Sequence, residues 1–287
     1  MADRSLSIVV GSNGAPGSVE GCLAALAGQA DEAEVIVCEP AASGAEVQAA
    51  FPFARFLERS GALVPELWRD GIDVTTGDDV ALTISPMRPA PDWVARLRAA
   101  LAEDGVVAGA IDPGEGLRLV DWAEYFCRYA RDMRPFERRE NPEIPGDNCG
   151  YRRDLLERTR ELYRHGFWEP EVNRALRAEG VRLWHDPGIV VRQGRSAGFG
   201  AFCRQRLEHG RAYGRLRGQR FGSGRNAAGV VLAVVVPLVL VARTAGEVFS
   251  RRRFRGRFLA SLPVLLVYDA AWALGEARGH LDSLRRR

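Results

Sequence analysis

The sequence predicts an α/β fold, in which a parallel or mixed sheet carries helices on both faces, followed by an apolar pair of C-terminal helices. Short apolar, β-branched runs at 5–10, 34–39, 80–84 and 106–111 alternate with segments of helical spacing. A length of 287 residues and a hydrophobic content of 46% are enough for a sizeable core. Beyond residue 225 the chain holds two long stretches that are almost free of charge.

Helical periodicity defines the segments between the strands. Helices are predicted at 21–29, 91–104, 119–133, 152–165 and 169–180. The clearest is 91–104, which begins at Pro91 and places Trp93, Leu97 and Leu101 on one face. Segment 135–148 is charged and Pro-rich and predicts a loop, and 181–193 predicts a strand, a turn and a second strand.

The apolar tail predicts a membrane-associating helical hairpin. Segment 226–242 is uncharged but short for a span, which needs about 20 apolar residues, and 258–277 is interrupted by Asp269 and Glu276. Arginines crowd before, between and after the two stretches, so crossing by both would translocate a basic linker. A re-entrant or surface-lying hairpin on the cytoplasmic leaflet avoids this, and two core helices of a soluble domain are the alternative. The predicted domains are therefore 1–220 and 221–287.

Composition excludes several classes. A formal charge of +3 gives no argument for a nucleic-acid partner. The five cysteines are odd in number and contain no CxxC pair, so neither a disulfide framework nor a zinc site is expected. The four histidines have no metal-ligand spacing, and the N-terminus reads as the first strand without a signal peptide.

A glycine-rich turn, VVGSNGAPGS, follows the first strand. Its glycines at 11, 14 and 17 have the spacing G-x-x-G-x-x-G, whereas dinucleotide binding uses G-x-G-x-x-G. An NAD-dependent enzyme is therefore disfavoured. Glu39 ends the next strand, where an acid can hydrogen-bond a ribose or a base, although it is equally a solvated strand end.

Five segments follow one another in a recognisable order: LSIVVGSNGAPGSVEGCLAAL, EVIVCEPAASG, ALVPELWRDGIDVTTGDDVALTISPMRPAPDWVARL, IPGDNCGYRRDLLE and GFWEPEVNRALRAEGVRL. Their order and spacing resemble those of family 2 glycosyltransferases, over roughly residues 5 to 280. The resemblance implies a GT-A fold and a nucleotide-diphospho-sugar as donor. The tail looks like that of some bacterial members, which implies an envelope or lipid-linked acceptor at the cytoplasmic side of the cell membrane.

The resemblance also implies roles for individual residues. On the donor side, Gly11, Ser12, Asn13 and Glu39 would hold the nucleobase and ribose, and Arg69 stands in the segment that corresponds to the family's R-N-x-G element.

On the acceptor side, the resemblance implies a loop that carries Asp147, Asn148 and Tyr151 as polar contacts. Glu169 corresponds to the catalytic base of an inverting transfer. An acid at a helix start is also what the helix dipole favours, so a structural role for Glu169 remains the alternative.

The sequence departs from the family at the end of the strand 80–84. An Asp-x-Asp that binds Mg²⁺ or Mn²⁺ is expected there, but Ser85, Pro86 and Met87 occupy these positions. No metal ligand is therefore assigned, although Mg²⁺ or Mn²⁺ bound without the usual Asp-x-Asp stays an open alternative, and Arg88 offers a guanidinium that could neutralise a leaving diphosphate instead. The favoured function is sugar transfer, and a catalytically inactive homologue that binds a nucleotide-sugar or serves as a scaffold is the alternative.

Overall fold

The computed structural model describes residues 4–195, 198–220 and 222–285, which form two compact units. The first unit comprises Met1–Gly114 and Asp132–Gly194, and the second comprises Glu115–Arg131 and Arg195–Arg287. The predicted boundary at residue 220 lies inside the second unit.

The first unit contains the sheet. Its strands are β1 (Leu6–Gly11), β2 (Glu34–Glu39), β3 (Ala54–Glu58), β4 (Asp79–Ile84), β5 (Met87–Pro89), β6 (Val106–Pro113), β7 (Arg139–Glu140), β8 (Asn148–Arg152) and β9 (Leu183–Gln193). Its helices are α1 (Ser18–Leu26), η1 (Ala27–Glu32), α2 (Ala45–Ala50), α3 (Val64–Val74), α4 (Trp93–Glu103), α6 (Arg153–Arg158), η2 (Arg160–Leu162) and α7 (Glu169–Ala178).

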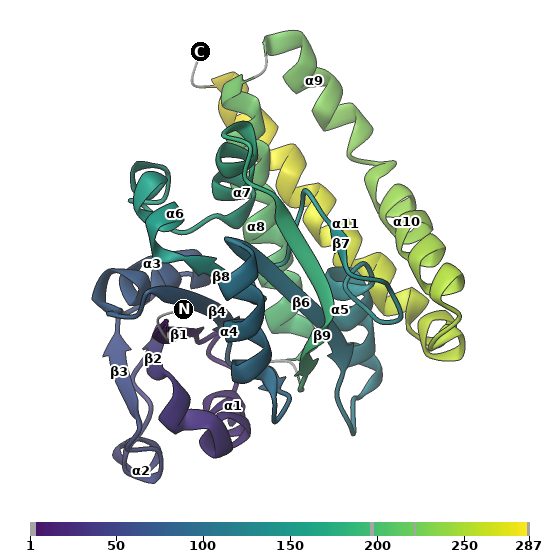
Figure 1. Ribbon diagram of the computed structural model, residues 1–287. Helices are drawn as coiled ribbons and strands as arrows, with labels where there is room; N and C mark the ends of the chain where they lie inside the picture. Colours follow the sequence, from purple (N-terminus) through teal and green to yellow (C-terminus); the bar gives the residue numbers. More distant parts are fainter. Residues whose placement is uncertain (1–3, 196–197, 221, 286–287) are drawn as a thin grey trace. The chain divides into compact units, whose positions relative to one another are not determined.

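The described strands form one mixed sheet in the order β3-β2-β1-β4-β8-β6-β9-β5, with β7 paired to β9 (Figure 1). The strands β1 to β4 are mutually parallel where they pair. Between β4 and β6 lies β8, which is antiparallel to both. Parallel strands whose carboxyl ends meet at one edge are what positions a ligand site in an open α/β sheet.

Helices cover both faces of the sheet, as predicted. Val9, Leu82 and Cys149 are register partners and share one face. A Cβ on Gly71 of α3 would lie 2.2 Å from Val9, so α3 covers this face. The next residue, Gly150, faces the other way, and a Cβ there would meet the leucine side chains of α4. Because successive side chains alternate across a strand, α3 and α4 lie on opposite faces.

Three predicted elements are corrected by the structure. The segment around 148–152, expected as an acceptor-side loop, is the central strand β8, because it fills the gap between β4 and β6. Residues 183–193 form one strand with an irregular register beside Gly109, where a strand, a turn and a strand were predicted. The helix predicted at 152–165 ends at Arg158 and continues only as the short turn η2.

The second unit is helical. It consists of α5 (Leu119–Tyr129), α8 (Phe199–Arg220), α9 (Ser223–Leu232), α10 (Val236–Arg251) and α11 (Arg255–Arg285). The long helix α11 contacts each of the other four. The first apolar stretch is therefore split between α9 and α10, which are bent by 68°, and the second forms the middle of α11.

Small residues let α8 and α11 approach closely. Gly210, Gly214 and Gly218 recur every fourth residue on α8, and a Cβ on any of them would lie 2.2 to 2.3 Å from an atom of α11. On α11, Gly275 and Gly279 face α8 in the same way. This matching of small residues at four-residue spacing on both helices is the arrangement that allows backbone-to-backbone packing.

Two acids of α11 pair with arginines of α8. Arg206 Nη2 lies 3.4 Å from Asp269 Oδ1, and Arg217 Nη1 donates to Glu276 Oε1 at 2.7 Å. Asp269 and Glu276 are almost completely buried. Asp269 and Glu276 are seven residues apart, or two helical turns, so they share one face of α11, and this face is packed against α8.

Candidate functional site

The carboxyl ends of β1 and β4 lie side by side and their following turns are joined. Gly11 pairs with Ile84, and the backbone N–H of Ser85 donates to the carbonyl of Gly11 at 3.0 Å. Ser85 Oγ donates to Asn13 Oδ1 at 3.2 Å and accepts from the backbone N–H of Asn13 at 3.3 Å. It also accepts from Ser18 Oγ at 2.8 Å. The glycine-rich turn and the corner after β4 are thus one hydrogen-bonded structure.

Ser12 is fixed by its neighbours. Its backbone N–H donates to the carbonyl of Cys38 at 2.7 Å, and its Oγ accepts from the N–H of Gly14 at 3.2 Å. The side chain is almost fully buried, whereas Asn13 is half-buried. Of this turn, the backbone beyond Ser12 and the side chain of Asn13 are the parts that a ligand can reach.

Trp68 of α3 fills the space beside these strand ends. Its Nε1 donates to the carbonyl of Thr83 at 2.9 Å, and the side chain is buried. A methyl group added to Gly11 would lie 3.0 Å from Trp68 Nε1, and one added to Gly146 would lie 2.8 Å from Trp68 Cη2. Glycine at both positions is therefore required for the indole to fit between β1 and the segment that leads into β8.

Glu169 lies next to Gly146, on the side that also faces Trp68. A methyl group on Gly146 would lie 3.1 Å from the carboxyl carbon of Glu169, which begins α7 and is half-buried. Burial is the main reason that the pKa of Cys149 is raised well above its usual value, and the charge of Glu169 raises it further. Both observations place the carboxylate beside β8, near the indole that packs on the end of β1.

The corner after β4 does not fit a divalent cation. Ser85 and Met87 are completely buried, and the hydroxyl of Ser85 is already committed to Asn13 and Ser18. Mg²⁺ and Mn²⁺ prefer carboxylate oxygens, which these residues lack. Across the described ranges, no group of three or more His, Cys, Asp or Glu side chains is arranged to hold a metal ion.

Arg88, on β5, directs its guanidinium into this corner. Nη1 donates to the carbonyls of Ser85 at 2.9 Å, Met87 at 3.1 Å and Ser18 at 3.3 Å. Burial lowers the pKa of Arg88. A Cβ on Gly21 would lie 2.2 Å from Arg88 Nη2, so the first turn of α1 also packs against the guanidinium. Arg88 therefore ties the two turns together at its present position.

The structure does not bring Glu39 and Arg69 into this constellation. Both carboxylate oxygens of Glu39 accept hydrogen bonds from Ser43, one from its backbone N–H at 2.8 Å and one from its hydroxyl. Arg69 Nη1 donates to the carbonyl of Arg164 at 2.8 Å, and its Nε lies 2.6 Å from Asp70 Oδ1. Their predicted donor-side roles remain predictions, made from the family pattern alone.

The acceptor-side candidates belong to the strand β8 or the residue before it. Asn148 is completely buried: its Nδ2 donates to the carbonyls of Ala110 and Ile189, and its Oδ1 accepts from Trp93 Nε1 at 2.8 Å. Tyr151 is equally buried, and its hydroxyl donates to Asn173 Oδ1 at 2.8 Å.

Both side chains therefore hold the core together, which corrects their assignment as acceptor contacts. The reason is that β8 is a central strand. Asp147 is also nearly buried, and its carbonyl accepts from Thr83 Oγ1 at 3.0 Å.

Sequence reasoning missed Trp68, Thr83 and Ser18 as parts of this site. Trp68 stands in the segment that resembles the family's R-N-x-G element, but a tryptophan on an amphipathic helix looks like an ordinary core residue. The signal that identifies it is the pair Gly11 and Gly146, and this becomes visible only when both glycines lie against the same ring.

Comparisons with known proteins give a likeness of structure. No family model and no curated protein sequence matches the chain. Among solved structures, the crystal structure of GalNAc-T7 with UDP, GalNAc and Mn²⁺ is similar, with a TM-score of 0.50 and 12% sequence identity. The match covers 67% of this chain and 43% of that chain, so this chain corresponds to less than half of its length.

The protein therefore has a GT-A fold, with a mixed, Rossmann-like sheet, helices on both faces and a long apolar C-terminal helix. This confirms the predicted fold class. At 12% identity the likeness concerns the fold alone.

Proposed function

We propose that the protein is a glycosyltransferase that moves a sugar from a nucleotide-diphosphate donor to an acceptor hydroxyl, with inversion of configuration. The observation that carries the proposal is the position of Glu169. It is more than 150 residues distant in sequence from the glycine-rich turn, yet it lies beside Gly146 and the indole of Trp68, and the same indole packs on Gly11 at the end of β1. A carboxylate beside the ligand-binding edge of a GT-A sheet is the feature that this reaction needs.

In the proposed step, Glu169 accepts the proton of the acceptor hydroxyl while that oxygen attacks the anomeric carbon from the face opposite the diphosphate. The bond between the anomeric carbon and the diphosphate oxygen breaks, and the nucleoside diphosphate leaves with the electron pair. The backbone of residues 11–14 and the side chain of Asn13 bind the donor. No Asp-x-Asp cation takes part, since Ser85 and Met87 are buried and lack carboxylates.

We place the reaction at the cytoplasmic face of the cell membrane, with a glycan or a lipid-linked acceptor. The exposed apolar residues of α9, α10 and α11 and the arginines that flank them support this location. One described helix, Arg255–Arg285, is long and apolar enough to cross a membrane, although 39% of its apolar window is buried by protein.

A second candidate is a homologue that binds a nucleotide-sugar without transferring it. The hydroxyl of Ser85 and the guanidinium of Arg88 favour this function, because both are committed to holding the corner together. Either function uses the same edge of the sheet.

Replacing Glu169 with glutamine separates the two candidates. We expect turnover of the cognate nucleotide-sugar to fall by about 100-fold or more, because the base is lost, while binding measured by calorimetry is retained. Glu171→Gln is the matched control: it removes an acid from the same helical turn, whose partner is Arg174.

Chelation provides a second measurement. Turnover of the parent protein should be unchanged by EDTA, because no carboxylate pair holds a cation at Ser85–Met87. Binding of the nucleotide-sugar with no turnover in the parent would favour the inactive homologue, and full activity of the Glu169→Gln variant would remove Glu169 from the reaction.

A further inference from the structure

The bend between α9 and α10 exposes a cluster of large apolar side chains. Residues 231–239, which we name the elbow, include Val231, Val234 and Leu238, which are 73%, 82% and 63% exposed. Leu232, Val235 and Val239 are exposed as well. The greatest exposure is thus at the apex of the bend, between the two helices (Figure 1). Contiguous apolar exposure of this kind marks an interaction surface.

Both arms of the elbow are fixed at their bases. On α9, Asn226 is completely buried, its Nδ2 donates to the carbonyl of Gly218, and His280 Nδ1 lies 2.9 Å from its Oδ1. On α10, Val248 is completely buried. The elbow therefore projects from a packed helical unit: its bases are buried, and at its tip Ala233 is buried while the larger apolar side chains named above are exposed.

The uncharged stretch that contains the elbow is short enough to lie within one leaflet of a bilayer. The uncharged stretch 226–242 is bounded by the exposed residues Arg225 and Arg243. Each arm of this stretch holds about seven residues, or roughly 10 Å of helix. The hydrocarbon of one leaflet is about 15 Å thick, so the arms reach into it, whereas the 68° bend makes the stretch too short to cross both leaflets.

The neighbouring helix α11 is bound to α8 along one face. Its backbone packs on α8 through Gly275 and Gly279, and its acids Asp269 and Glu276 pair with arginines of α8. If α11 crossed the membrane, these arginines would have to enter hydrocarbon with it, which is strongly unfavourable. The length and apolar composition of α11 would allow it to cross a membrane, but its packing on α8 argues against a crossing.

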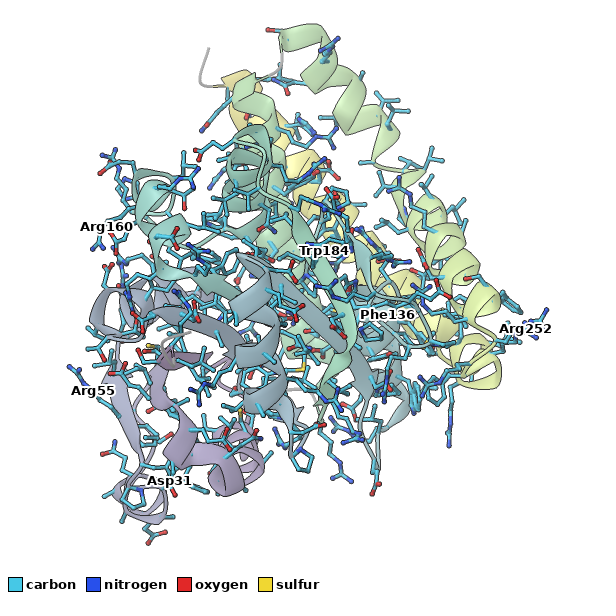
Figure 2. The ribbon with its side chains drawn as sticks, in the orientation of Figure 1. Asp31, Arg55, Phe136, Arg160, Trp184 and Arg252 are labelled. Carbon is cyan, nitrogen blue, oxygen red and sulfur yellow. The ribbon has the colours of Figure 1, made fainter. Side chains whose placement is uncertain are left out.

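We propose that the elbow inserts into one leaflet of an anionic bilayer as a re-entrant wedge, and that α11 does not cross. Charge complementarity argues for lipid as the occupant: Arg225 and Arg243 bound the wedge, and the sequence RRRFRGR runs from the end of α10 through the turn into the start of α11. Arg252, in this turn, points away from the helices (Figure 2). The proposal rests on the membrane location in the proposed function and names the segment that provides it.

Vesicle sedimentation of the full chain tests the wedge. The parent should bind phosphatidylcholine vesicles that contain phosphatidylglycerol more tightly than vesicles of phosphatidylcholine alone. Val234→Asp should reduce binding on the order of 100-fold, because a carboxylate would replace an apolar group in hydrocarbon. The matched control is Leu162→Asp, which changes a leucine that is 53% exposed in the first unit and should bind like the parent. Circular dichroism checks that both variants fold.

Topology is tested in inverted membrane vesicles from expressing cells. An impermeant maleimide should label Ser223→Cys and Arg243→Cys equally, relative to the parent, since both ends of a re-entrant wedge lie on the same side. Protection of one end only would show a crossing and overturn the proposal. Equal vesicle binding by Val234→Asp and the parent would also overturn it, as would a dimer that Val234→Asp converts to a monomer without lipid.

Sugar transfer measured in detergent distinguishes this proposal from the function on which it rests. Val234→Asp should keep parental turnover there, because the substitution is far from Glu169 in sequence and lies in the other unit. Elbow-dependent vesicle binding without any turnover would refute the proposed function and leave the wedge standing. Turnover together with vesicle binding that does not depend on the elbow would refute the wedge and leave the proposed function standing.

Discussion

At the residue scale, Arg88 lies where three backbone carbonyls converge. The sequence suggests that the guanidinium of Arg88 neutralises a leaving diphosphate. In the structure, this guanidinium instead donates to three carbonyl groups of the protein itself. A buried carbonyl that loses its donor retains its desolvation cost, so this side chain stabilises the corner whether or not it also contacts a ligand.

Arg88→Ala should therefore lower the free energy of unfolding by about 1–3 kcal/mol, measured by urea denaturation, because three carbonyls lose a buried donor. Arg55→Ala removes an exposed arginine of β3 and is the control, with little change expected. Unchanged stability together with weakened nucleotide-sugar binding would assign the guanidinium to the ligand instead of the corner.

At the element scale, the α8–α11 pair shows how glycine decides which helices can meet. A Cβ on Gly214 would lie 2.2 Å from the carbonyl oxygen of Glu276, which is backbone and cannot move aside like a flexible side chain. Nothing lies within 4 Å of the corresponding position on Gly200 of the same helix. The two glycines belong to the same helix and are opposite in packing.

Gly214→Ala should destabilise the protein by about 1–3 kcal/mol because the methyl group forces the helices apart. Gly200→Ala should be neutral or stabilise by up to about 1 kcal/mol through helix propensity. Thermal unfolding of the two variants compares them directly. Equal effects would mean that α8 and α11 do not pack through these glycines.

At the scale of the whole molecule, the chain does not divide where its composition changes. The second unit takes α5 from the middle of the chain, and α11 packs on both α5 and α8. Phe258, Leu265 and Tyr268 of α11 are completely buried in this unit. Ending the chain at residue 220 would remove them and leave their partners on α5 and α8 exposed.

A chain of residues 1–220 should accordingly aggregate or bind hydrophobic dye, as measured by size-exclusion chromatography and dye fluorescence. A chain that ends at Gly194, with a short Gly-Ser linker in place of 115–131, should fold. The backbone N–H of Ile111 donates to the carbonyl of Asp132 at 3.0 Å, so the two ends to be joined lie close together. A soluble, cooperatively unfolding 1–220 chain would instead support the boundary predicted from composition.

Local pattern was sufficient for strands that are continuous apolar runs and for a helix with a clear apolar face. The strands β1, β2, β4 and β6 and the helix α4 lie where apolar runs and the Trp93, Leu97 and Leu101 face predict them. The absence of carboxylates in the corner after β4 was also visible in the sequence, because the residue types at 85–87 are sufficient to show which metal ligands are missing. The short elements β3, β5 and β8 have too few residues to produce a period, and only pairing with neighbouring strands defines them.

The sequence by itself determined the α/β class and the uncharged stretch 226–242, and it predicted the edge of the sheet for the site and, through the family resemblance, the candidate base Glu169. Tertiary structure decided that β8 runs through the middle of the sheet, that Trp68 lies between Gly11 and Gly146, and that α11 is bound to α8 while the elbow is exposed. The physical reason is distance along the chain: periodicity reports which face of an element is apolar, but the partner of that face is fixed by contacts between residues far apart in sequence.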